Sequence, residues 1–62
     1  MSGNDLIQKI GVSTVSYSDA IQKVVEEVNK ECPVQWFEVL EQRGRVTPKG
    51  MVEFQVIVRI GV

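Results

Sequence analysis

The stretch VEFQVIVRI, Val52–Ile60, alternates apolar and polar residues more regularly than any other part of the sequence. Because successive side chains of a β-strand point to opposite faces, one face of this strand is almost purely apolar. That face carries Val52, Phe54, Val56, Val58 and Ile60, and the other carries Glu53, Gln55, Ile57 and Arg59. The stretch therefore predicts a strand with one side in the core and one mixed side outside it.

A second strand precedes this one, from about Val34 to Gln42, and TPKG at Thr47–Gly50 has the composition of a tight turn between the two. The turn pairs Phe37 with Ile60 and Val39 with Val58, which brings the two apolar sides together. On the reverse side it pairs Glu38 with Arg59, Leu40 with Ile57, and Gln42 with Gln55. A shift of one residue would set Phe37 against polar positions, so the pattern itself selects this register.

The segment before the hairpin predicts an amphipathic helix. Its apolar residues recur at helical spacing and form a single stripe, namely Tyr17, Ala20, Ile21, Val24, Val25 and Val28. Ser16 is placed to cap the N-terminus, with Asp19 three residues on in a position resembling a capping box. Pro33 forbids continuation, so the helix ends by about Glu31.

One further strand, LIQKIGV (Leu6–Val12), places Leu6, Ile10 and Val12 on one face. The helix connects this strand to the strand that carries Phe37, and a right-handed crossover makes those two strands parallel. The hairpin then sets the last strand antiparallel to both. The predicted class is α+β, with a β-α-β-β order and a three-stranded antiparallel sheet, in strand order 1-3-2, wrapped around one helix. Residues 1–5 are hydrophilic and are expected to be disordered, so the single domain spans residues 6–62.

Length and composition predict self-association. The chain has 62 residues, and a domain of this size buries only roughly 60% of its unfolded surface. Such chains usually need a disulfide, a metal or partner subunits. One cysteine, Cys32, excludes an internal disulfide, and the lack of histidine disfavours a structural zinc site, so no metal is expected. Cys32 itself is expected to be a small buried residue.

The charge balance and the chain start set further expectations. Seven basic and eight acidic residues provide no basic surface for nucleic acid. The start MSGNDLIQ lacks the regions of a signal peptide, and no apolar run is long enough for a membrane span. The default expectation is a cytoplasmic protein with no nucleic-acid or membrane partner.

Trp36 raises the functional question. It is adjacent to Phe37, so when Phe37 enters the core Trp36 must lie on the face that the helix does not cover. An exposed tryptophan on a small domain indicates an interface or a ligand site. An indole can stack on a planar ligand, and the amide of Gln55 on the same face could match the edge of a heterocycle. The simpler alternative is that Trp36 only fills a contact between subunits.

The segments QWFEVLEQRGRV and VEFQVIVRIGV, together with the upstream GVSTVSYSDAI, resemble the dodecins, a family of small flavin-binding proteins. The resemblance implies a hollow homododecamer built from trimers, with flavins (FMN or riboflavin) held in pairs near two-fold axes between subunits. It implies that Trp36 stacks on the flavin, that Gln55 bonds its polar edge, and that Arg43 lies near the ribityl or phosphate group. It also implies flavin storage with quenching of the excited state, and no turnover.

Two departures from the family pattern bear on these expectations. The ECPVQW connection, at residues 31–36, is one residue shorter than in bacterial dodecins, which could shift the start of the second strand. The sequence reaches Gly61–Val62 without the arginine that follows in many relatives, which weakens the case for coenzyme A as a ligand. No catalytic residues are predicted, because no histidine or recognisable pair of carboxylates is present. The alternative to flavin binding is a structural homo-oligomeric assembly module without bound flavin.

Overall fold

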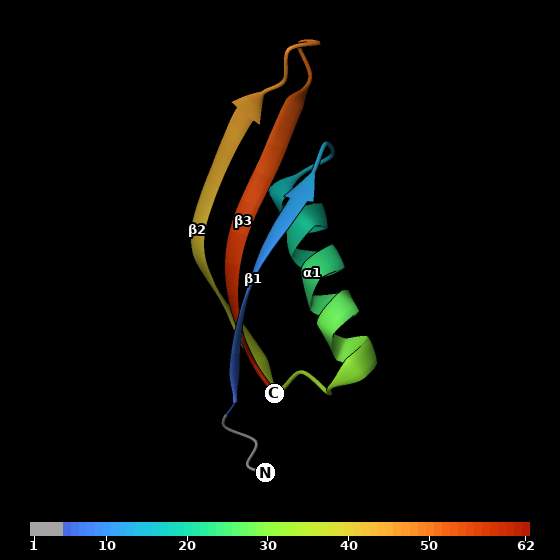
Figure 1. Ribbon diagram of the computed structural model, residues 1–62, viewed down its shortest axis with the longest axis vertical. Coiled ribbons are helices and arrows are strands. Elements are labelled where there is room, and N and C mark those ends of the chain that lie inside the picture. Colours follow the sequence, from blue (N-terminus) through green and yellow to red (C-terminus); the bar gives the residue numbers. More distant parts are fainter. Residues whose placement is uncertain (1–4) are drawn as a thin grey trace.

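The computed structural model describes residues 5–62 as four elements in the order β-α-β-β (Figure 1). The elements are β1 (Leu6–Ser13), α1 (Tyr17–Glu31), β2 (Trp36–Val46) and β3 (Val52–Gly61). The strands form one sheet in the order β1-β3-β2, and both outer strands run antiparallel to β3. The predicted fold class and strand order are confirmed. The expected disorder of residues 1–5 stays a prediction, since residues 1–4 lie outside the described part.

The helix begins and ends where the sequence predicts. The side chain of Ser16 accepts a hydrogen bond from the backbone N–H of Asp19 at 2.9 Å, which satisfies one free donor of the first turn. The Asp19 carboxylate does not complete a capping box; it accepts from Ser13 Oγ at 2.6 Å and pairs with Lys23 at 3.2 Å. Cys32 caps the other end, directly before Pro33, and is exposed, so the expectation that it is buried was wrong.

The core lies between α1 and the near face of β1 and β3. Its fully packed residues come from the helix stripe and from the apolar side of β3, namely Ala20, Val24, Val28, Val56, Val58 and Ile60. Gly11 allows α1 to approach closely, because a Cβ there would lie 2.3 Å from Val24 Cγ2. At the N-terminal end of α1, the rings of Tyr17 and Phe54 meet edge to face at 5.0 Å.

The helix does not reach across the whole sheet. It packs on β1 and β3 and makes little contact with β2, as the ribbon in Figure 1 also shows. Phe37 therefore lies on the helix side of β2, as its pairing with Ile60 requires, but it remains 47% exposed. The expectation that Phe37 enters the core of its own chain was wrong, because the aromatic ring lies beyond the edge of α1.

The hairpin register is correct at one end and shifted at the other. Phe37 pairs with Ile60, Glu38 with Arg59 and Val39 with Val58, as predicted. A bulge at Leu40 then moves the rest of β2 by one residue, so that Ile57 faces Glu41 and Gln55 faces Arg43. The predicted pairs of Leu40 with Ile57 and of Gln42 with Gln55 were therefore wrong. The turn itself is as expected: Gly50 donates to the carbonyl of Thr47 at 2.8 Å, and its φ of 85° suits glycine.

Candidate functional site

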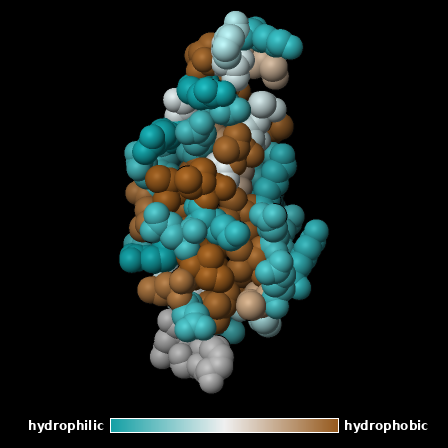
Figure 2. All heavy atoms as spheres, in the orientation of Figure 1, coloured by the Kyte–Doolittle hydropathy of each residue, from teal (hydrophilic) through white to brown (hydrophobic). Residues whose placement is uncertain are grey.

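The face of the sheet opposite α1 (the open face) has no covering layer among residues 5–62. Its apolar residues include Leu6, Ile10 and Val12 of β1 and Trp36 of β2, and Ile10 is 68% exposed. In the space-filling view, brown apolar side chains gather along the middle of the molecule between teal polar ones (Figure 2). Several large apolar side chains on one face of so small a domain indicate a surface that binds something.

Trp36 is the first residue of β2 and pairs with Gly61 of β3. The two residues share the open face, and the indole occupies the space above Gly61. A Cβ added to Gly61 would lie 2.3 Å from Trp36 Nε1 and 2.4 Å from Cε2. The backbone N–H of Gln35 donates to the carbonyl of Gly61 at 2.8 Å, which fixes the start of the strand. The indole therefore rests on bare backbone, and 46% of Trp36 remains exposed.

Gln55 and Arg43 lie at the other end of the open face and are brought together by the bulge. They pair across β3 and β2, and Val12 of β1 flanks Gln55 on the other side. Arg43 Nη2 donates to Glu41 Oε2 at 3.0 Å. The predicted register, without the bulge, would have placed Gln42 opposite Gln55 and Arg43 on the helix side. The bulge thus moves Arg43 to the face on which the predicted site lies.

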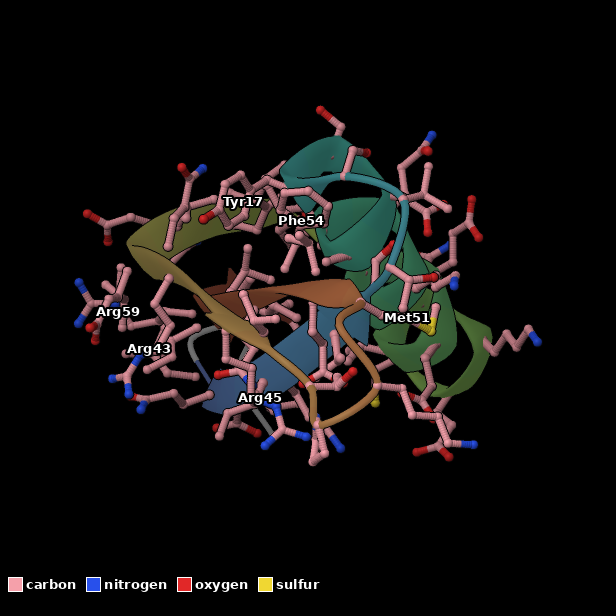
Figure 3. The ribbon with its side chains drawn as sticks, turned by 90° about the horizontal axis from the view of Figure 1, so that it is seen from above. Tyr17, Arg43, Arg45, Met51, Phe54 and Arg59 are labelled. Carbon is pink, nitrogen blue, oxygen red and sulfur yellow. The ribbon has the colours of Figure 1, made fainter. Side chains whose placement is uncertain are left out.

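A short chain of polar contacts surrounds Gln55. Its Nε2 donates to Glu53 Oε1 at 3.1 Å, and Arg45 Nε donates to the same oxygen at 2.8 Å. The hydrogen bond from Gln55, followed by that from Arg45, lowers the pKa of Glu53. Figure 3 shows Arg43 and Arg45 projecting from the sheet on the side away from Tyr17 and Phe54. This end of the open face is therefore polar, whereas the Trp36 end is apolar.

The three predicted site residues share a face but do not form one pocket in a single chain. Gln55 is six residues from Gly61 along β3, and Trp36 lies beside Gly61. At roughly 3.3 Å per residue, the two ends are about 20 Å apart along the strand. That span is longer than a three-ring heterocycle, so one ligand cannot contact Trp36 and Gln55 of the same chain.

The sequence interpretation missed three residues of this face. Gly61 could have been found, because the correctly predicted end of the register already sets it opposite Trp36. Glu53 and Arg45 gave no usable signal. The contact of Arg45 with Glu53 depends on the bulge, and the contact of Glu53 with Gln55 depends on side-chain torsions. Glu38 and Arg59, in contrast, form the predicted cross-strand pair at 2.7 Å.

Other parts of the described chain offer less. A cavity of about 220 Å³ lies between β1 and the C-terminal half of α1, away from all predicted site residues. It is lined by Ile7, Lys9, Glu27, Val28, Glu31 and Cys32. Within residues 5–62, no group of three or more His, Cys, Asp or Glu side chains could hold a metal ion. The helix in the same range is neither long nor apolar enough to cross a membrane.

Comparison with known families gives one match, to the family model described as Dodecin, over residues 5–62. A comparison with curated proteins gives no match.

Solved structures with the same fold are similar to the chain over most of its length. A Thermus thermophilus dodecin carrying an arginine-to-alanine substitution is 31% identical, with a TM-score of 0.81, over 92% of this chain and 85% of that chain. A tryptophan-to-phenylalanine variant of the same protein is 29% identical, also with a TM-score of 0.81, over 92% and 87%. The calcium dodecin of Mycobacterium tuberculosis is 20% identical, with a TM-score of 0.88, over 94% and 84%. At that identity the last likeness shows the fold alone.

Proposed function

The chain belongs to the dodecin family, and from this membership we propose that it binds and stores flavin, as FMN or riboflavin. In this proposal, flavins stack on Trp36 and contact Gln55 within a hollow homododecamer.

One observation carries the proposal: the indole of Trp36 lies outside the hydrophobic core and is supported from below by Gly61. A ring that is supported on one side and exposed by 46% is ready to stack on a planar guest. Stacking of a base on an aromatic side chain contributes about 1–3 kcal/mol in nucleic-acid complexes, which is a rough guide to its value here.

The separation of Trp36 and Gln55 supports a site that is shared between copies of the chain. A ligand that touches both residues must take them from different subunits, because the two residues lie about 20 Å apart in one chain by strand geometry. The apolar side chains of the open face, such as Ile10, supply surface for such an assembly. Phe37, uncovered on the other face, supplies more.

In this proposal, different residues of the chain stack on the flavin and orient it. The Trp36 indole is the proposed electron donor to the excited flavin, and return of the electron dissipates the light energy without photochemistry. Gln55 holds the polar edge of the ring and sets its orientation. Arg43, which already pairs with Glu41, is the proposed contact for a ribityl or phosphate group. We propose neither a catalytic residue nor a coenzyme A site.

The test is a fluorescence titration of riboflavin or FMN with the purified protein. Wild type is expected to extinguish flavin emission, and Trp36→Ala is expected to leave it largely intact. Emission that persists with wild type, or that both proteins quench equally, contradicts the proposal.

The uncovered apolar residues also favour a second candidate, an assembly module in which Trp36 only joins subunits. That candidate predicts no affinity for flavin and a broken oligomer in Trp36→Ala. The flavin proposal expects the oligomer of this variant largely to survive, which light scattering measures.

A further inference from the structure

Glu53 lies between Arg45 and Gln55 on the open face, and a single oxygen of its carboxylate serves both neighbours. Oε1 accepts from Arg45 Nε at 2.8 Å and from Gln55 Nε2 at 3.1 Å. The Glu53 side chain is only 20% exposed, whereas that of Arg45 is 58% exposed, so the chain of contacts is shielded from water at Glu53 and open to it at Arg45. The arrangement is therefore a partly shielded chain of three side chains that ends at Gln55.

The chain of bonds fixes which end of the Gln55 amide faces outward. An ionised carboxylate only accepts hydrogen bonds, so it can face the NH₂ group of Gln55 but not the carbonyl oxygen. The hydrogen bond from Gln55, followed by that from Arg45, lowers the pKa of Glu53 and favours the ionised carboxylate. Among residues 5–62, the side-chain hydrogen bond of Gln55 is the one that Nε2 donates to Glu53, and its carbonyl oxygen Oε1 takes no part in it. That oxygen is the atom left to receive a ligand.

We propose that Glu53, held by Arg45, is a positioning residue that sets the Gln55 amide with its carbonyl oxygen toward the ligand. The site then selects heterocycles whose polar edge carries an N–H donor. This inference rests on the flavin binding proposed above. The imide N–H of the isoalloxazine is such a donor, and methylation of that nitrogen leaves Gln55 Oε1 without a partner.

The experiment compares the affinity for riboflavin with the affinity for its analogue methylated at the imide nitrogen. Wild type is expected to prefer riboflavin by about tenfold, the loss that follows when a polar group is left unpaired. In Glu53→Leu the amide is free to turn and donate to the ring carbonyls, so the preference is expected to fall to about threefold or less.

Glu41→Leu is the matched control, because it removes an equal charge from an arginine pair on the same face without touching Gln55. It is expected to keep the full preference. Glu53→Gln retains a carbonyl acceptor and is expected to keep most of the wild-type preference for riboflavin. This variant also covers the case in which Glu53→Leu fails to fold. A preference that survives in Glu53→Leu, or that Glu41→Leu loses equally, overturns the positioning role while flavin binding stands.

A readout without ligand separates this inference from the proposed function. In the ¹⁵N NMR spectrum of the flavin-free protein, Glu53→Leu is expected to shift the side-chain amide signals of Gln55, and Glu41→Leu is expected to leave them in place. Unchanged signals in Glu53→Leu overturn the inference. If Glu53→Leu shifts these signals but the wild-type protein binds neither riboflavin nor FMN, the proposed function and the ligand selection are overturned. The contact between Glu53 and Gln55 is then still supported.

Discussion

The two faces of the sheet carry similar apolar side chains, but within the described residues 5–62 only one of them is covered by another element. On the covered face Ile60 is fully buried under α1, whereas on the open face Ile10 is 68% exposed. Ile60 belongs to a strand that alternates apolar and polar residues, and Ile10 to a strand with apolar residues on both faces. The side chains of the covered face stabilise the fold of one chain, and those of the open face remain available for another molecule. Hydropathy does not distinguish residues that stabilise the fold from candidate binding residues, whereas the burial of each side chain within one chain does.

The largest expected effect on stability comes from a substitution on the covered face. Ile60→Ala is expected to lower the free energy of unfolding by about 2–5 kcal/mol, because it removes methyl groups from a closed core. Such a loss is a large part of the stability of any small domain. Urea denaturation at a fixed protein concentration measures it.

The matching change on the open face, Ile10→Ala, is expected to act on assembly instead. It should raise the protein concentration at which the assembly dissociates, as light scattering measures, with an effect on the folded chain of about 0.5 kcal/mol or less. Equal losses of unfolding free energy for the two variants at all protein concentrations would contradict the distinction between the faces.

The next effect concerns the support beneath Trp36. Gly61→Ala places a methyl group where the indole lies, 2.3 Å from Nε1, so the ring must move off the strand. Flavin affinity is expected to fall by about tenfold or more, the scale of a lost stacking contact. A flavin fluorescence titration measures the affinity.

Gly44→Ala serves as the control for that substitution, since the nearest atom to its added Cβ is the carbonyl oxygen of Glu53 at 3.2 Å. It is expected to keep the quenching of flavin. A wild-type affinity in Gly61→Ala would show that the ring's place on Gly61 is irrelevant to binding.

Arg43 offers a smaller test, at the polar end of the open face. Arg43→Ala is expected to lower the affinity for FMN relative to riboflavin by about threefold, as for an exposed charge pair. Only the phosphate distinguishes these two ligands, so the ratio of affinities isolates the charge. Lys23→Ala, on the helix, is the control and should leave the ratio unchanged. An equal fall for both ligands in Arg43→Ala would place Arg43 away from the phosphate.

The smallest effect is on the pH dependence of stability at the start of α1. The hydrogen bond from Ser13, followed by that from Lys23, lowers the pKa of Asp19. Since the unfolded chain binds this proton more readily, the stabilisation is present above the ordinary pKa of Asp19. It is lost as the pH falls below about 4 and through the folded pKa.

Ser13→Ala should reduce this loss of stability on acidification. Urea midpoints at about pH 6 and about pH 3, compared between variant and wild type, measure the difference. The pKa of Glu53 is lowered as well, but it contributes equally in wild type and variant and so does not affect the difference between them. An identical acid response in Ser13→Ala would contradict the assignment.

The fold could be predicted from the sequence because its signals are periodic. The alternation of Val52–Ile60 and the apolar stripe of the helix determine the elements, their order and the first part of the register. The bulge at Leu40 could not be predicted, since a single extra residue interrupts no pattern. The exposure of Phe37 depends on where α1 lies across the sheet, which the sequence of neither element specifies.

The candidate site could be predicted only as a set of residues. Trp36, Gln55 and Arg43 were chosen from residue type and from the family resemblance, and their binding roles stay predictions. The contacts of Glu53 depend on side-chain torsions, which the sequence pattern does not specify. The separation of Trp36 and Gln55, in contrast, follows from the predicted pairing of Trp36 with Gly61. Register alone could have identified Gly61 as the residue opposite Trp36.

The extra residue at Leu40 also gives the gene a position at which the loss of one codon leaves the strand pairing unchanged. Deletion of that single codon would join Val39 to Glu41, restore an uninterrupted pairing with β3, and leave Arg43 opposite Gln55 and Arg45 opposite Glu53 on the open face. The core between α1 and β3 would be left in place. A relative could thus lose this codon and keep both the fold and the face that carries Arg43, and alignments of homologues across this strand should test for a gap at that codon.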